Sequence, residues 1–146
     1  MIGIVGILVD SPRDFPDSPE KSAPLCVLIV DDEPLIRWSL AETLVEHGYA
    51  VVQAGDGKGA LAALADPLLV DVVMLDYRLP DSDGLQLLAA IRGLSPHSRV
   101  VVMTAYGTSE MAAEALRLGA VDVVNKPIEM HDVAELLLRV RTTGIA

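Results

Sequence analysis

Short apolar runs alternate with amphipathic stretches through most of this chain. Apolar runs of about four to eight residues, rich in β-branched side chains, are typical of strands that are buried on both faces. The stretches between them carry apolar residues at three- and four-residue spacing, which is the pattern of helices with one buried face. Strict alternation of this kind predicts a parallel sheet joined by right-handed crossovers. We therefore expect an α/β fold, a doubly wound sheet of five parallel strands with five helices on its two faces.

The expected elements follow one another from Leu25 onward. The strands are residues 25–30, 49–54, 70–76, 99–103 and 120–124. The helices are residues 34–47, 60–65, 84–94, 109–118 and 129–141. Residues 77–84, which are rich in Asp, Pro and Gly, are expected to form a loop.

The first 24 residues differ from the rest in composition. Ile2–Val9 is apolar but short, and residues 10–24 contain four prolines and three serines. We expect a flexible N-terminal leader over residues 1–24, one domain over residues 25–143 and a tail over residues 144–146. The sequence leaves open whether Ile2–Val9 is an extra strand, a sticky arm or a misassigned start.

Composition excludes several classes of function. The formal net charge of -10 argues against direct nucleic-acid binding by this chain, which would require basic patches. The single cysteine, Cys26, excludes an internal disulfide and a cysteine-rich metal site, and it is expected to pack as a small hydrophobe. No apolar run approaches the ~20 residues of a membrane span, and no signal peptide is recognisable. We therefore expect a cytoplasmic protein without membrane contact.

Charged and polar side chains follow four of the expected strands. Asp31 and Asp32 follow the first strand, Asp76 ends the third, Thr104 follows the fourth and Lys126 follows the fifth. Ligands of open α/β sheets bind beyond the carboxyl ends of the strands, so these side chains are expected to share one pocket.

The charges in this pocket predict a metal ion. Two carboxylates about 4 Å apart repel each other by roughly 4 kcal/mol at an effective dielectric of ~20, and Lys126 supplies only one positive charge. An all-oxygen donor set fits Mg²⁺ or Mn²⁺. Such a site attracts phosphoryl groups, for which a carboxylate can be the nucleophile. Asp76 is the best candidate because it stands alone on the central strand, whereas Asp31 and Asp32 are better placed to hold the metal.

Five stretches occur in a defined order along the chain: Leu28–Pro34, Leu75–Gly84, Met103–Gly107, Leu118–Ala120 and Asn125–Pro127. Together they resemble the receiver domain of two-component response regulators, over about Leu25 to Arg141. The resemblance implies a flavodoxin-like sheet with strand order 2-1-3-4-5. It also implies that a sensor histidine kinase transfers a phosphoryl group to Asp76 within a phosphorelay.

The resemblance also assigns metal ligands. Asp32 and Asp76 would bind Mg²⁺ directly, together with the backbone carbonyl of Arg78, and Asp31 would act mainly through water. The phosphoryl transfer and the later hydrolysis would be catalysed by the domain itself, which acts mainly as a switch.

Further residues are implied for the switch. Thr104 resembles the hydroxyl residue that turns toward the phosphoryl oxygen, and Lys126 resembles the lysine that pairs with it. The Lys126–Pro127 bond would be cis, as in the family. Many members have an aromatic residue where this chain has Val123, so a switch based on an aromatic rotamer is in doubt.

The resemblance implies an output surface as well. The fourth helix, fifth strand and fifth helix would form a face for a homodimer or another partner. Asp32–Leu40 and Met103–Gly107 are most similar to receivers of nitrogen-regulation-type transcriptional activators, which regulate transcription through further domains. This chain is then either a stand-alone receiver or part of a longer regulator.

Two other functions compete with a phosphorylated receiver. One is a degenerate receiver that acts as an interaction module without phosphorylation, an alternative that Val123 keeps open. The other is an aspartate-nucleophile phosphatase of the haloacid dehalogenase type, which has a second Asp two residues after the nucleophile. Arg78 occupies that position here and argues against the phosphatase.

Overall fold

The computed structural model of this chain describes residues 2–5, 24–65 and 69–142. Its main sheet contains β1 (Ile2–Val5), β2 (Cys26–Val30), β3 (Ala50–Ala54), β4 (Val72–Asp76), β7 (Arg99–Thr104) and β8 (Asp122–Asn125). The helices are α1 (Pro34–Glu46), α2 (Gly57–Ala65), α3 (Gly84–Leu94), α4 (Ser109–Arg117) and α5 (Met130–Thr142). The strand order is β1-β3-β2-β4-β7-β8. Strands β3, β2, β4, β7 and β8 are mutually parallel, which confirms the predicted five-stranded sheet and its order.

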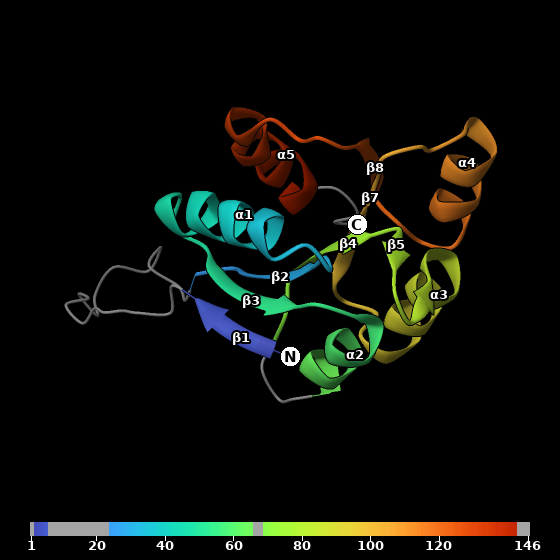
Figure 1. Cartoon of the computed structure of the whole chain (residues 1–146), viewed down its shortest axis with the longest axis horizontal. Helices are drawn as coiled ribbons and strands as arrows, with labels where there is room; N and C mark the ends of the chain where they lie inside the picture. The colour runs from blue at the N-terminus through green and yellow to red at the C-terminus, as the bar shows by residue number, and fades with distance from the viewer. Residues whose placement is uncertain (1, 6–23, 66–68, 143–146) are drawn as a thin grey trace.

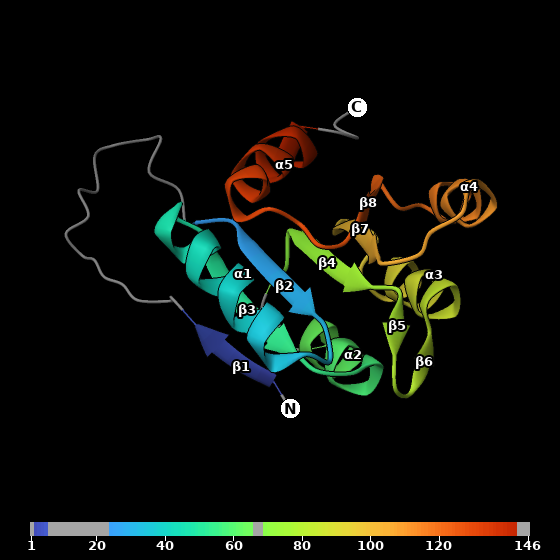
Figure 2. The ribbon, with the colours of Figure 1, turned by 45° about the horizontal axis from the view of Figure 1, so that its top comes forward.

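Helices cover both faces of the sheet. Helices α1 and α5 lie on one face, and α2, α3 and α4 lie on the other (Figures 1 and 2). Each face has its own apolar cluster, because alternate residues of the central strands point to opposite sides. All five residues of β4 are buried, as expected for a strand at the centre of such a sheet. Among the residues described, no helix is long and apolar enough to cross a membrane.

Most predicted boundaries agree with the structure to within one or two residues. One prediction is wrong by more: α2 begins at Gly57 and not at Ala60. The expected loop over residues 77–84 also contains a small antiparallel hairpin of β5 (Arg78–Leu79) and β6 (Ser82–Asp83). The hairpin places its turn near the first residues of α2, and this contact is described below.

The N-terminal residues add a strand to the sheet. Ile2–Val5 forms β1, which pairs antiparallel with β3 from Ile2 opposite Ala54 to Val5 opposite Val51. Of the three roles that the sequence left open for this segment, the structure has the extra strand. The rest of the predicted leader, apart from Pro24, and the predicted tail lie outside the described residues.

Cys26 packs inside β2, as predicted for a small hydrophobe. Burial, with a further contribution from the carboxylate of Asp71, raises the pKa of its thiol to about 11. The thiol therefore remains protonated at neutral pH, and its role is in packing.

Candidate functional site

The predicted side chains meet at the carboxyl ends of the parallel strands. Lys126 Nζ lies 2.9 Å from Asp31 Oδ2 and 3.4 Å from Asp76 Oδ2. Carboxylate oxygens of Asp31, Asp32 and Asp76 all lie within 4.8 Å of one another. Asp31, Asp76 and Thr104 are buried, whereas Asp32 is exposed. The structure thus brings three carboxylates and one ammonium into a single pocket, with Thr104 at the end of the neighbouring strand.

Asp31 is held by hydrogen bonds of its backbone N–H, its backbone carbonyl and its side chain. Its N–H donates to the carbonyl of Ala54 at 3.1 Å, which continues the pairing of β2 with β3 by one residue. Its Oδ1 accepts from the N–H of Glu33 at 2.9 Å, and its backbone carbonyl accepts from Arg37 Nη1 at 2.6 Å. These contacts tie the segment between β2 and α1 to the end of β3 and to the first turn of α1.

Asp76 ends β4 and is followed directly by the hairpin. The N–H of Tyr77 donates to the carbonyl of Met103 at 2.8 Å, so the backbone beyond Asp76 remains attached to β7. The N–H of Arg78 lies 3.3 Å from Asp76 Oδ1 and donates to it. The Asp76 side chain is thus oriented by its own loop as well as by its strand.

The electrostatics of the pocket favour a bound cation. Burial and, after it, the nearby carboxylate of Asp31 raise the pKa of Asp76, although Lys126 acts in the opposite direction. Burial by itself would lower the pKa of Lys126, but its hydrogen bonds and charge pairing with Asp31 and Asp76 prevail and raise it. Lys126 is therefore charged at neutral pH, and its single charge does not balance three carboxylates.

The donor chemistry fits a hard divalent ion. All three acidic side chains offer oxygen atoms, which Mg²⁺ and Mn²⁺ prefer. Both oxygens of Asp31 already accept hydrogen bonds, from Glu33 and from Lys126. The exposed carboxylate of Asp32 therefore has more freedom to bind a metal directly than that of Asp31 has.

Thr104 ends β7 next to this pocket. Its side chain is only 3% exposed, and its Oγ1 accepts from the N–H of Tyr106 at 3.3 Å. Its backbone carbonyl accepts from the N–H of Lys126 at 2.8 Å, which ties the two functional residues together. Val123 is partly buried against the apolar cluster beneath α4. The Lys126–Pro127 peptide bond is cis, as expected.

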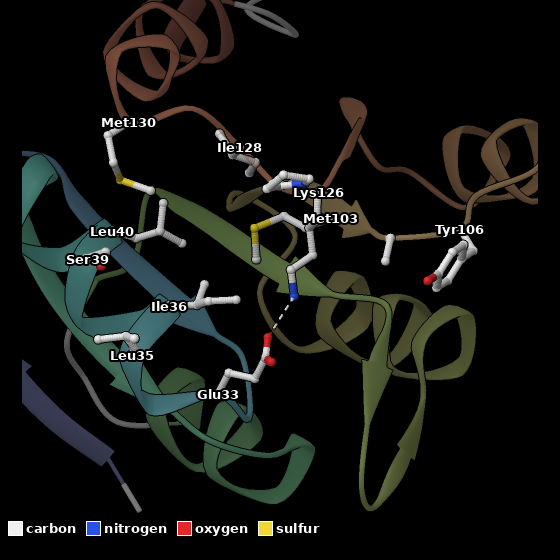
Figure 3. Close-up of a pocket in the computed structure, with 12 residues that line it drawn as sticks. Glu33, Leu35, Ile36, Ser39, Leu40, Met103, Tyr106, Lys126, Ile128 and Met130 are labelled. Atoms are coloured by element: carbon white, nitrogen blue, oxygen red, sulfur yellow. Dashed lines mark ion pairs between the residues drawn. The ribbon is translucent and has the colours of Figure 1, made fainter.

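Sequence reasoning missed two residues that contact the site. Glu33 Oε1 lies 3.8 Å from Lys126 Nζ, and Figure 3 shows the two side chains reaching toward each other. In the sequence, Glu33 appeared only as part of the stretches Leu28–Pro34 and Asp32–Leu40. Arg37 was missed because nothing in a helical pattern shows that its guanidinium turns back toward the end of β2.

An apolar pocket of about 610 Å³ adjoins the acidic site. In Figure 3, side chains from α1 face Met103 and the segment after Lys126 across this pocket. Glu33 and Lys126 lie at its polar end. The sequence did not predict this pocket, since its walls come from three separate parts of the chain. The lining includes Leu35, Ile36, Leu40, Met103, Tyr106, Ile128 and Met130.

A family model, curated proteins and solved structures all match this chain over most of its length. The sequence pattern of the Response regulator receiver domain matches residues 27–138. The chain is 38% identical over 113 residues to the regulatory protein AtoC of Escherichia coli, covering 77% of this chain and 24% of AtoC. It is 35% identical over 109 residues to sporulation initiation phosphotransferase F of Bacillus subtilis, covering 75% of this chain and 87% of that protein. A crystal structure of the NtrX receiver domain from Brucella abortus is 36% identical, with a TM-score of 0.74 over 81% of this chain and 99% of that one.

The relatives differ in how much of their length this chain spans. It corresponds to about a quarter of AtoC but to most of sporulation initiation phosphotransferase F. The similarity therefore concerns one domain, and the matched range, residues 27–138, spans every strand-end residue of the acidic pocket.

Proposed function

This chain belongs to the receiver domain family of two-component response regulators, and from that premise we propose that Asp76 accepts a phosphoryl group from a phosphohistidine of a sensor histidine kinase. The observation that carries the proposal is the position of the Asp76 carboxylate. It ends the central strand, 3.4 Å from the Lys126 ammonium and within 4.8 Å of the carboxylates of Asp31 and Asp32. A phosphoryl group on Asp76 would thus be next to a cation and next to candidate metal ligands.

The transfer is a substitution at phosphorus. A carboxylate oxygen of Asp76 forms the new P–O bond while the P–N bond of the donor breaks, and the imidazole nitrogen keeps the electron pair of that bond. Lys126 offsets the negative charge on the phosphoryl oxygens. In the later hydrolysis, water attacks the phosphorus atom, the P–O bond to Asp76 breaks, inorganic phosphate leaves and the Asp76 carboxylate is regenerated.

The proposed metal is Mg²⁺ or Mn²⁺. Asp32, Asp76 and the backbone carbonyl of Arg78 would hold it, and Asp31 would act mainly through water. When bound, the ion would supply positive charge that offsets the negative charge of the phosphoryl oxygens. The exposure of Asp32 and the hydrogen bonds that already use both oxygens of Asp31 support this division of roles.

The output of the proposed switch involves Thr104. Its hydroxyl would turn toward a phosphoryl oxygen on Asp76 and change the face made by α4, β8 and α5, which would then bind a partner or a second copy. Val123 replaces an aromatic side chain here. Movement of Thr104 and of the segment after it is therefore proposed to act without an aromatic rotamer change.

We expect the donor to approach Asp76 from the side of the apolar pocket, whose lining includes Lys126. Large apolar side chains are exposed on that side, where Leu35 is 72% and Tyr106 85% exposed. Both line the apolar pocket beside Lys126. We therefore expect a kinase to contact this apolar surface while its phosphohistidine reaches Asp76.

Intact-mass spectrometry after incubation with acetyl phosphate and Mg²⁺ tests the proposal. The wild-type chain is expected to gain one phosphoryl group, and Asp76→Ala none. Glu46→Ala, which removes an exposed acid from the last turn of α1, is the control and is expected to be phosphorylated.

Two results would favour the alternatives. A wild-type chain that binds Mg²⁺ but gains no mass from acetyl phosphate or from a phosphorylated kinase would support an interaction module. Repeated turnover of a generic phosphate ester without a stable phosphorylated form would support a phosphatase.

A further inference from the structure

The carboxylate of Asp81 joins two segments that are 24 residues apart in the sequence. Its Oδ1 accepts from the N–H of Gly57 at 2.8 Å, and its Oδ2 accepts from the N–H of Lys58 at 3.1 Å. These are the first two residues of α2, whose N–H groups have no carbonyl partner within the helix. Asp81 therefore caps α2 from the turn of the β5–β6 hairpin.

The contact is close as well as polar. Ser82 Oγ donates to Asp81 Oδ1 at 2.9 Å, which orients the carboxylate at the turn. A Cβ atom at Gly57 would overlap Ser82 Oγ and would lie 3.0 Å from Ser82 Cβ. The absence of a side chain at Gly57 thus lets the hairpin lie directly against the start of α2.

The hairpin needs such an attachment. A two-stranded ribbon is marginally stable by itself, and here only Arg78–Leu79 and Ser82–Asp83 pair. One end is held by Asp76, whose Oδ1 accepts from the N–H of Arg78. The turn is held by the two hydrogen bonds from α2. The hydrogen bond from Gly57 is also the main reason that the pKa of Asp81 is low, so the carboxylate is charged when it makes these bonds.

We propose that Asp81 is a positioning residue for the metal site, because it fixes the hairpin that carries the backbone carbonyl of Arg78. The inference rests on the proposed function, in which that carbonyl is a metal ligand. Asp81 contacts no reacting atom in this scheme. It acts through the backbone, and Gly57 provides the space in which it can act.

Calorimetric titration of the full chain with Mg²⁺ tests this role. Asp81→Ala is expected to weaken Mg²⁺ binding about tenfold, which is the usual effect of losing a group that orients a ligand. Asp81→Ala also removes a negative charge near the cation, and this loss would weaken binding by itself. A second variant that leaves the net charge unchanged is therefore needed. Gly57→Ala leaves the charge unchanged but pushes Ser82 and the hairpin away, and it is expected to weaken binding by a similar factor.

Asp56→Ala is the matched control. Asp56 Oδ1 accepts from the N–H of Gly59 at 2.7 Å, so this change also removes an acid and a cap from the start of α2, but the hydrogen bond that it removes is to α2 and not to the hairpin. Asp56→Ala is expected to bind Mg²⁺ like the wild-type chain. Circular dichroism of each variant establishes that it is folded.

The outcomes separate the inference from the proposed function. Wild-type affinity in folded Asp81→Ala or Gly57→Ala would overturn the positioning role while leaving the metal site intact. Equal weakening in Asp56→Ala would also overturn it, because the effect would then follow from charge or from α2. Failure of the wild-type chain itself to bind Mg²⁺ would instead reject the proposed function, and the positioning role with it.

Discussion

The ammonium of Lys126 lies nearer to Asp31 than to Asp76, at 2.9 Å against 3.4 Å. The Asp31 side chain has no exposed surface, so its charge depends on this contact and on the N–H of Glu33. One lysine therefore neutralises a buried carboxylate and faces the proposed phosphoryl acceptor. Its removal has consequences for folding as well as for phosphoryl transfer.

Lys126→Met is expected to lower the free energy of unfolding by about 3 kcal/mol, because it leaves the buried charge of Asp31 without its partner. Urea unfolding at neutral pH in a chelating buffer measures the change. Added Mg²⁺ should restore part of the loss, since it supplies positive charge to the same carboxylates. Lys58→Met removes an exposed lysine and should stay within about 0.5 kcal/mol of the wild-type chain. Equal stability of the two variants would contradict the prediction.

Asp76→Asn is expected to stabilise the metal-free chain at neutral pH. Because burial and Asp31 raise the pKa of Asp76, its carboxyl binds a proton more tightly in the folded chain than in the unfolded one. Proton binding by Asp76 therefore stabilises the folded chain fully below the ordinary aspartate pKa. This stabilisation is lost as the pH rises through the raised pKa. Asn has no such loss, so the advantage of the variant should shrink as the pH falls. Urea unfolding of both chains from neutral pH down to the ordinary aspartate pKa tests this prediction. A stability difference that does not change with pH would contradict a raised pKa for Asp76.

Asp32→Ala and Asp31→Ala should separate metal binding from folding. Asp32 is exposed, so its removal is expected to change the free energy of unfolding by less than about 0.5 kcal/mol. The same change should weaken Mg²⁺ binding more than about tenfold if Asp32 is a direct ligand. Asp31→Ala should instead destabilise the chain by roughly 2 kcal/mol or more, since Lys126 and the N–H of Glu33 lose a buried partner. Calorimetry and urea unfolding of both variants give the comparison.

Thr104→Val should uncouple phosphorylation from the change at the output face. Valine keeps the volume of this buried side chain but lacks the hydroxyl group. Phosphorylation by acetyl phosphate is expected to persist, with a rate within about tenfold of the wild-type rate, since one hydrogen bond contributes about 1 kcal/mol. Amide chemical-shift changes in α4, β8 and α5 on phosphorylation should be smaller than in the wild-type chain. Changes of the same size in both would exclude the Thr104 hydroxyl as the switch.

Much of the fold could be predicted because its determinants are local. The run Val72–Leu75 is apolar without interruption, and it stops at an acid followed by turn residues. That pattern is enough to place Asp76 at the end of a buried strand. Parallel topology then brings it to the same edge of the sheet as Asp31 and Lys126, whatever the details of the loops.

The remainder depends on contacts between distant residues. The apolar pattern of α2 begins at Ala60, so it placed the start of the helix three residues late. The first turn is held by polar contacts, from the adjacent Asp56 to Gly59 and from Asp81, 24 residues away, to Gly57. Three carboxylates were equally plausible partners for Lys126, and the nearest one, Asp31, is separated from it by 95 residues. Sequence spacing predicts that such groups meet, but side-chain packing decides which of them form bonds.

The antiparallel strand β1 has a consequence for self-association. Without it, the sheet would end at β3, whose residues Ala50–Ala54 include no charged side chain, and such an edge readily pairs with other polypeptides. Ile2–Val5 occupies that edge and replaces it with an outer strand of four residues, and short outer strands are one of the ways in which proteins avoid aggregation. A chain shortened to Leu25, where the family resemblance begins, would lose this protection but would keep every residue of the proposed phosphorylation site.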